Sequence, residues 1–230
     1  MPLVDLAIGR VQPHVTGVAV NLHHGRALLQ EHLVGRVHLS EEEPEALGTA
    51  GALGQLREWI DGRSVLVTNA DAWLPVDLSA LVEGWDGDRI RLLVVDDPGQ
   101  GDFGPARYCG AALLPWAVVQ DLAPVPSGLY ELRWRTAWAA GTLDLVDCPG
   151  PFIDCGTPQD YLAANLAASG GATVVGPGAV VDPTATLERC VVWPDAVVGP
   201  GEQLVDAVRA GPLTVFVRDR CGAGSATYGR

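Results

Sequence analysis

Two aspartates end apolar stretches that have the pattern of buried strands. Asp71 ends the segment SVLVTNAD, and Asp154 ends the segment PFID just before the start of a helix. In an open α/β sheet, ligands bind beyond the carboxyl ends of the strands, so both carboxylates fall where a ligand is expected. Two facing carboxylates would bind Mg²⁺, which favours a few carboxylates together with substrate phosphates. Singly, Asp71 could be a turn residue and Asp154 a helix cap, but the pair favours a metal site.

A run of small residues in EALGTAGAL gives a third chemical signal. Gly48, Thr49, Ala50 and Gly51 open a predicted helix. Small side chains let backbone approach a flat ligand closely, and helix amino termini favour anions. The local alternative is that Thr49 simply caps the helix.

The elements that must position these residues alternate along the first two-thirds of the chain. Strands are expected near 18–22, 36–40, 64–69 and 89–97, and helices near 3–11, 25–33, 49–60 and 77–85. This alternation predicts an α/β sandwich around a mostly parallel sheet. The Gly- and Pro-rich residues 99–115 are expected to form loops that wrap a ligand, followed by a Trp-rich helix. Further along, Thr157 and Asp160 form a T-x-x-D box that predicts another helix start.

Beyond Gly171 the apolar pattern changes to a period of six, with a slip of one residue in the middle. The recurring positions are Val175, Val181, Leu187, Val192, Val198 and Leu204. A six-residue period with Gly-Pro turns is typical of a left-handed parallel β-helix, whereas a hairpin meander would give a period of two. We therefore expect a β-helix over residues 172–210 and a tail over 211–230, frayed from residue 218. The open end of such a coil leaves backbone groups unpaired, so a homo-oligomer through it is expected.

Composition narrows the classes of partner. The 230 residues carry a net charge of -13, which argues against binding to nucleic acid or to an anionic membrane surface. An anionic ligand would need a cation as mediator. All fifteen basic residues are arginine, so no mechanism can use a lysine of this chain. The five cysteines are scattered and unpatterned, which predicts reduced thiols and a cytoplasmic setting.

Three segments in this order and spacing resemble the sugar-1-phosphate nucleotidyltransferases, also called sugar-nucleotide pyrophosphorylases. They are LSEEEPEALGTAGAL, VLVTNADAW and FIDCGTPQDYLAANL. The trailing repeats are similar to those of the mannose-1-phosphate guanylyltransferase-like branch. The resemblance reaches about residue 210 and implies a Rossmann-like nucleotidyltransferase domain over 1–171, incomplete at its amino terminus. It also implies an enzyme that uses Mg²⁺, a nucleoside triphosphate and a sugar 1-phosphate to make an NDP-sugar and pyrophosphate.

The resemblance assigns roles to particular residues. Asp71 and Asp154 would be the catalytic residues that hold Mg²⁺, and residues 48–51 would line the base pocket. Gly110 resembles a backbone position beside the sugar, and Glu131 resembles the carboxylate that accepts hydrogen bonds from sugar hydroxyls. Two alternatives stay open: Gly110 merely permits strand packing, and Glu131 is an ordinary exposed helix residue.

One family element has no counterpart in these 230 residues. The family begins with a strand and a loop of the type G-x-G-T-R-x-R-P, followed by a Pro-Lys pair, whereas PLVDLAIGR resembles its first helix. One hypothesis is that an in-frame segment upstream of Met1 encodes the missing parts and that the 230-residue form is nearly inactive. The rival is a non-catalytic, nucleotide- or sugar-phosphate-binding regulatory homologue.

Three further chemistries are disfavoured. A β-helix acyltransferase is a poor fit because no histidine lies in or near the short repeat. The five histidines before residue 39 lack ligands at zinc-binding spacing, so a solvated loop is expected there. Cys155 has no histidine in a suggestive context and is expected to be an inert thiol.

Overall fold

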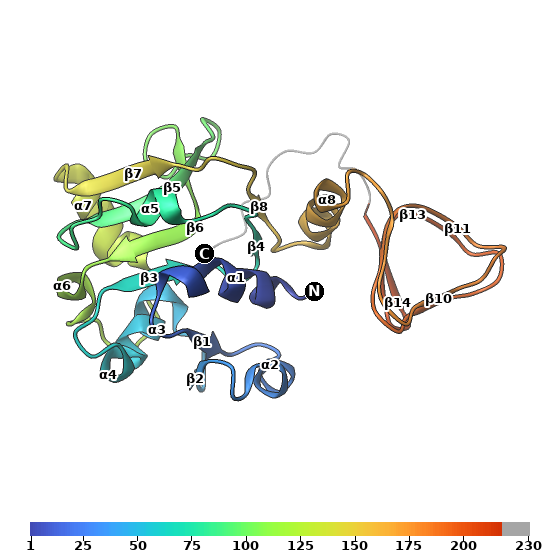
Figure 1. Cartoon of the computed structure of the whole chain (residues 1–230), viewed down its shortest axis with the longest axis horizontal. Helices are drawn as coiled ribbons and strands as arrows, with labels where there is room; N and C mark the ends of the chain where they lie inside the picture. The colour runs from blue at the N-terminus through green and yellow to red at the C-terminus, as the bar shows by residue number, and fades with distance from the viewer. Residues whose placement is uncertain (218–230) are drawn as a thin grey trace. The chain divides into compact units, whose positions relative to one another are not determined.

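The computed structural model describes residues 1–217, so the predicted frayed tail at 218–230 lies outside the described residues. The chain divides into two compact units, Met1–Phe152 (unit 1) and the part from Ile153 onward (unit 2). Figure 1 shows both units and labels many of their elements. The predicted boundary at residue 171 differs from this division, because the helix that precedes residue 171 belongs to unit 2. The prediction that residue 171 ends the nucleotidyltransferase domain stays a prediction.

The main sheet of unit 1 has four strands in the order β3-β6-β5-β7. Their bounds are Val65–Thr68 (β3), Ile90–Asp96 (β5), Ala106–Leu114 (β6) and Leu143–Asp147 (β7). β6 runs antiparallel to both β3 and β5, and only β5 and β7 are parallel. The prediction of a mostly parallel sheet is therefore wrong for this sheet. The short connection over residues 97–105 turns the chain straight back, which gives antiparallel neighbours without a crossover.

Strand β6 occupies residues that the sequence analysis placed in loops. Its last six residues, from Cys109 to Leu114, are all buried, and it lies between β3 and β5. The glycines and proline that suggested a loop lie mostly at Gly99–Pro105, in the connection before the strand. Gly110 has φ +88°, and the register with β5 shifts beside it, as expected for a β-bulge at a glycine.

A separate parallel pair, β1 (Ala19–Leu22) and β2 (His38–Glu41), is connected through helix α2 (Arg26–Leu33). This is the predicted strand-helix-strand order, since parallel strands require a crossover. Within residues 1–217, β1 pairs only with β2, and β3 pairs only with β6. Each therefore has one edge without a strand partner in the described part of the chain.

Helices cover both faces of the main sheet, which confirms the α/β sandwich (Figure 1). Side chains of β5 alternate between two cores: Leu92 and Val94 pack with α3 and α4, whereas Leu93 packs with α1 and α5. The remaining elements of unit 1 are α1 (Leu3–Val11), η1 (Gln12–His14), α3 (Gly48–Gln55), α4 (Arg57–Ile60), β4 (Ala72–Trp73), α5 (Ser79–Val82), α6 (Trp116–Val119), the π-helical turn η2 (Tyr130–Trp134) and α7 (Arg135–Ala139).

Unit 2 begins with β8 (Ile153–Asp154) and helix α8 (Pro158–Ala168). The predicted capping box is confirmed. The Asp160 backbone N–H donates to Thr157 Oγ1 at 3.2 Å, and the Thr157 hydroxyl donates to Asp160 Oδ2 at 2.5 Å. Leu162 of α8 then packs on Val191 and Val208 of the following coil.

The rest of unit 2 is a coil of short strands that Figure 1 shows as a triangle. Its strands are β9 (Val174–Val175), β10 (Val180–Val181), β11 (Thr186–Val192), β12 (Val197–Val198), β13 (Gln203–Ala210) and β14 (Leu213–Phe216). Parallel partners lie 17 positions apart, as Val174 and Val191 or Leu187 and Leu204 do. One full turn of the coil is thus 17 residues long. This is one residue fewer than three six-residue repeats, because the pattern slips by one residue in each turn. β14 runs antiparallel to β13. A left-handed sense of the coil stays a prediction.

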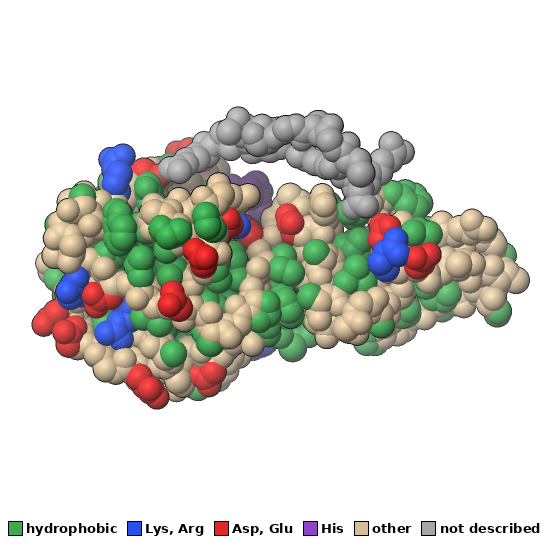
Figure 2. Space-filling view, turned by 90° about the horizontal axis from the view of Figure 1, so that it is seen from above, with side chains coloured by type: hydrophobic (Ala, Val, Ile, Leu, Met, Phe, Trp, Pro, Cys, Tyr) green, Lys and Arg blue, Asp and Glu red, His purple; other side chains and the backbone are tan. Residues whose placement is uncertain are grey.

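The surface agrees with the acidic, mixed composition. On the face shown in Figure 2, acidic and basic side chains are interspersed among apolar ones rather than gathered in one basic patch. Among residues 1–217, no helix combines the length and the apolar character needed to cross a bilayer.

Candidate functional site

Asp71 lies between β3 and β4 with an exposed side chain. The structure gives its carboxylate no hydrogen bond or ion pair with any residue of 1–217. A turn aspartate normally accepts a local backbone N–H, so the turn alternative has no contact in its favour. The apolar residues of β3 are ordered by pairing with β6, and they bring a free carboxylate to the end of the strand.

Gly110 holds the chain just before Asp71. The Asn69 N–H donates to the Gly110 carbonyl at 2.9 Å, which extends the pairing of β3 with β6 by one bond. A Cβ on Gly110 would stand 3.3 Å from Asn69 Cβ, and its positive φ disfavours other residues. The packing alternative for Gly110 therefore has direct support. Its predicted place beside a sugar stays a prediction.

Arg10 of α1 holds the same segment from the other side. Its guanidinium donates to Thr68 Oγ1 at 2.8 Å, to the Asn69 carbonyl at 3.2 Å and to the Leu74 carbonyl at 3.0 Å. Burial lowers the pKa of Arg10. Arg10 is not among the predicted site residues, although its position three residues after the buried Ala7 places it next to the apolar face of α1.

Asp154 ends β8, and its side chain is exposed and without a hydrogen-bond or ion-pair partner among the described residues. The alternative that Asp154 caps the next helix is wrong, because Thr157 is the N-cap of α8. Asp71 and Asp154 belong to different units, so their sharing of one cation stays a prediction. Two unpaired carboxylates are the hard oxygen donors that Mg²⁺ takes, so the donor set fits this ion. Residues 1–217 contain no group of three or more His, Cys, Asp or Glu side chains that could hold a metal.

The small residues of α3 pack mainly against the protein itself. The Ala50 N–H donates to the Ser127 carbonyl at 3.0 Å, and a Cβ on Gly48 would lie 2.7 Å from the same oxygen. A Cβ on Gly51 would overlap the carbonyl oxygen of Val125. The close approach predicted from the small residues is therefore present, but with residues 123–129 as the neighbour.

Two of the four predicted base-pocket residues are open to a ligand. Gly48 and Thr49 are exposed, whereas Ala50 and Gly51 are buried. Thr49 does not cap the helix, because the N-cap is Leu47. Instead, its Oγ1 accepts the backbone N–H of Leu129 at 3.1 Å. The base-pocket role of these residues stays a prediction.

Glu42 fixes the loop that leads into α3, and the sequence analysis did not distinguish it from its acidic neighbours. Only 2% of this residue is exposed. Its carboxylate accepts the Leu47 backbone N–H and the Asn21 side-chain amide, each at 2.9 Å. Three consecutive glutamates carry no spacing signal, so only the surrounding contacts show that the middle one is buried.

Glu131 lies in η2, a π-helical turn, and its side chain is exposed. A Cβ on Gly128 would overlap Glu131 Oε2, so the carboxylate lies against the backbone of that glycine. π-Helical turns occur frequently at functional sites, which favours a functional role for Glu131. Its predicted contact with sugar hydroxyls stays a prediction.

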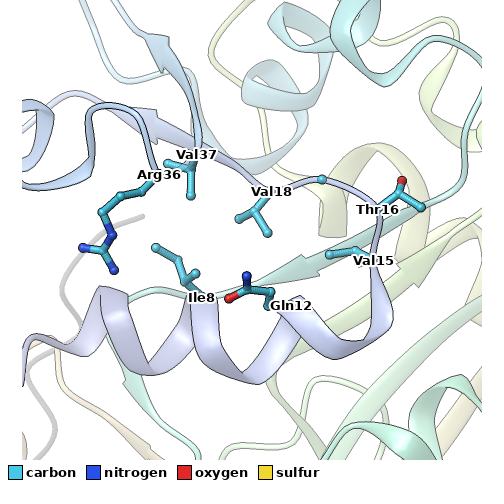
Figure 3. A pocket seen from close by; sticks show the side chains of 8 residues that line it. Ile8, Gln12, Val15, Thr16, Val18, Arg36 and Val37 are labelled. Carbon is cyan, nitrogen blue, oxygen red and sulfur yellow. The ribbon is translucent and has the colours of Figure 1, made fainter.

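A pocket of about 600 Å³ lies elsewhere in unit 1, between α1 and the segments that lead into β1 and β2 (Figure 3). Its lining residues are Ile8, Gln12, Val15, Thr16, Gly17, Val18, Arg36 and Val37. None of the predicted site residues lines it.

Comparisons with known proteins show two curated relatives of the predicted type, although no family model matches the chain. The N-acetylmuramate alpha-1-phosphate uridylyltransferase of Caulobacter vibrioides is 24% identical over 200 residues, which cover 71% of this chain and 82% of that protein. Mannose-1-phosphate guanylyltransferase 1 of Arabidopsis thaliana is 26% identical over 218 residues, covering 76% of this chain. The chain spans only 60% of the length of the latter protein.

Solved structures share the fold. A Thermus thermophilus protein, described as mannose-1-phosphate geranyltransferase, has a TM-score of 0.63 and 15% identity, over 94% of this chain and 84% of that one. A Bacillus anthracis structure named for glucose-1-phosphate thymidylyltransferase has a TM-score of 0.62 and 17% identity, over 73% of this chain and 82% of that one. The chain is thus similar, in sequence and in fold, to the sugar-1-phosphate nucleotidyltransferases, which confirms the resemblance of its ordered motifs and is consistent with an enzyme of this kind.

Proposed function

We propose that this protein transfers a nucleotidyl group from a nucleoside triphosphate to a sugar 1-phosphate, in a reaction that depends on Mg²⁺. A phosphate oxygen of the sugar 1-phosphate attacks the α-phosphorus in line, and the bond from this phosphorus to pyrophosphate breaks. The observation that carries this proposal is Asp71, which follows β3, is exposed and has no partner within residues 1–217, while the segment just before it is held by Arg10 and Gly110. The names of the curated relatives support this reaction class.

The residue roles in this proposal follow from exposure and charge. Asp71 and Asp154 would hold Mg²⁺, which when bound neutralises charge on the triphosphate. The chain has a net charge of -13, so a cation is needed for a triphosphate to bind favourably. Gly48 and Thr49, at the exposed start of α3, would border the base, and Glu131 would accept hydrogen bonds from sugar hydroxyls. Binding both substrates in one orientation supplies much of the rate.

The coil and the cysteines support two further parts of the proposal. The coil would be left-handed, and its strands would associate with those of a second copy. The cysteines of the described residues, Cys109, Cys148, Cys155 and Cys190, are free thiols, which fits a reducing cytoplasmic setting.

A second candidate function is binding without catalysis. The complete absence of lysine from the 230 residues favours it. Such a protein would keep the base and sugar contacts and would lack the grip on the departing pyrophosphate.

Pyrophosphate release tests the proposal. The purified protein is incubated with Mg²⁺, each common nucleoside triphosphate and a panel of sugar 1-phosphates. With a pair that gives release, even slow release, Asp71→Asn should lower the rate by about 100- to 1000-fold, in the range seen when one transition-state stabilising group is removed. The matched control is Glu58→Gln, an exposed carboxylate on α4, which should be unaffected. Unchanged turnover in Asp71→Asn would contradict the metal role. Nucleotide binding by calorimetry without any release would favour the second candidate.

A further inference from the structure

The loop that carries Asp71 is short of internal support. β3 ends at Thr68 and β4 begins at Ala72, and Asp71 itself has no hydrogen-bond or ion-pair partner within residues 1–217. A carboxylate without a protein partner keeps its place only if the backbone beneath it is fixed. The fixed points must therefore lie on either side of Asp71.

Arg10 supplies fixed points on both sides with one planar group. Nη2 donates to Thr68 Oγ1 and to the Asn69 carbonyl, before Asp71, and Nη1 donates to the Leu74 carbonyl, after it. The Asn69 backbone is held at its N–H as well, because this group donates to the Gly110 carbonyl. The five N–H donors of a guanidinium are arranged in a rigid fork, so this grip constrains the spacing of the two flanks.

Burying the Arg10 guanidinium costs free energy, which a residue that only fills space would not need to spend. Arg10 is half-buried, burial lowers its pKa, and its Nε is buried without a hydrogen-bond partner. The described residues offer it no carboxylate within ion-pair distance, so its charge is met by neutral oxygens alone. An apolar residue at the same position of α1 would avoid this cost and would leave the Asp71 loop without its clamp.

We propose that Arg10 is a positioning residue that holds the Asp71 carboxylate in place for a divalent cation. This inference deepens the proposed function and rests on it for the role of Asp71. Arg91 is a suitable comparison, because its buried Nε also has no hydrogen-bond partner among the described residues, although it forms an ion pair with Asp144 Oδ2 at 4.0 Å. It donates to the carbonyls of Leu81, Glu83 and Gly84, so it fixes the end of α5 instead of the Asp71 loop.

The test compares Arg10→Met, Arg10→Lys and the control Arg91→Met in the full chain. Hydrogen exchange of the amides in residues 69–74 reports the loop directly. We expect exchange about 10-fold faster in Arg10→Met, partial rescue in Arg10→Lys, and no change there in Arg91→Met. Exchange that is unchanged in Arg10→Met, or equally raised in both Met variants, overturns the proposal.

Binding of Mn²⁺ alone, followed by electron paramagnetic resonance, separates this inference from the proposed function. Mn²⁺ takes the same oxygen ligands as Mg²⁺. We expect its half-saturating concentration to rise about 10-fold in Arg10→Met and at least as much in Asp71→Asn, and to stay unchanged in Arg91→Met. A rise in Asp71→Asn without one in Arg10→Met overturns the positioning role alone. An unchanged half-saturating Mn²⁺ concentration in Asp71→Asn contradicts the metal role in the proposed function. Hydrogen exchange of residues 69–74 then decides whether Arg10 positions the loop.

Discussion

The coil of unit 2 and the site region of unit 1 are built from different kinds of contact. In the coil, a residue meets its parallel partner 17 positions along the chain, and this spacing repeats through every pair. In unit 1, Arg10 reaches Thr68 across 58 positions, and Leu129 reaches Thr49 across 80. A repeating contact leaves a period in the sequence, whereas a single long-range contact leaves none. The coil can therefore be predicted from spacing, whereas the long-range contacts around the candidate site cannot.

The glycines of the two regions also differ in whether their neighbours lie at a repeating distance along the chain. Gly178 has φ +75° and Asp195, 17 positions later, has φ +58°, so both occupy the same corner of successive turns. In α3, Gly51 and Gly54 instead make room for backbone of residues 123–125, which lies far away in the sequence. Side chains are disfavoured at both kinds of position, by the left-handed φ at Gly178 and by overlap with distant backbone at Gly51.

The largest effect on stability is expected from Gly51→Ala in unit 1. The new Cβ would overlap the Val125 carbonyl oxygen, and backbone on both sides must move. Overpacking of this kind should lower the free energy of unfolding by about 3 kcal/mol, the upper end of the usual range, as measured by urea denaturation. The control is Gly9→Ala on the exposed side of α1, where no atom lies within 4 Å of the added carbon. It should stabilise the protein by about 0.5–1 kcal/mol. Equal effects of the two changes would show that α3 does not depend on this packing.

A smaller effect is expected in the coil, where adjacent residues point to opposite sides. Val198 is 1% exposed and packs in the coil core, whereas Val197 is 57% exposed. Val198→Ala should lower the free energy of unfolding by about 2 kcal/mol, because it removes buried methyl groups and leaves a cavity. Val197→Ala should change it by less than about 0.5 kcal/mol. Urea denaturation of the two variants checks the predicted phase of the repeat, and the reverse order of effects would contradict it.

The smallest effect concerns pH and the ion pair between successive turns. The Arg189 side chain donates to both Asp206 carboxylate oxygens at 2.6 Å and lowers the pKa of Asp206 below its ordinary 3.8. A lowered folded pKa stabilises the protein above the ordinary value, and this contribution is lost as pH falls through the lowered pKa. The Arg189 side chain is 46% exposed and that of Asp206 35%, so solvent screens the pair and the loss should be smaller than that in Val198→Ala.

The variant Asp206→Asn isolates this contribution. It should be slightly less stable than the wild type at pH 7, and the difference should disappear as the pH is lowered toward 3 and below. Arg189→Gln should lose at least as much stability at pH 7, because it removes this pair together with the ion pair to Glu188. Denaturation curves at several pH values give the comparison. A difference between wild type and Asp206→Asn that persists unchanged at low pH would show that the ion pair is not its source.

The sequence by itself determined the elements that depend on local spacing. The apolar period and its slip predicted which residues stack in the coil, and the T-x-x-D box at Thr157 predicted where α8 begins. It also indicated the strand that ends near Asp71, because a continuous apolar run followed by polar residues is a local signal. The ordered motifs pointed to the relatives that the comparisons then found.

Only the tertiary structure decided the direction of β6, the burial of Glu42, the neighbour of the α3 glycines and the grip of Arg10 on the Asp71 loop. The glycines near β6 look the same in sequence whether they make a loop or a turn before a strand. Small residues in α3 look the same whether a ligand or a backbone segment fills the space beside them. In each case the deciding partner lies far away along the chain. Composition and spacing describe the residue itself and its near neighbours, whereas burial and hydrogen bonding depend on which distant segment comes to lie against it.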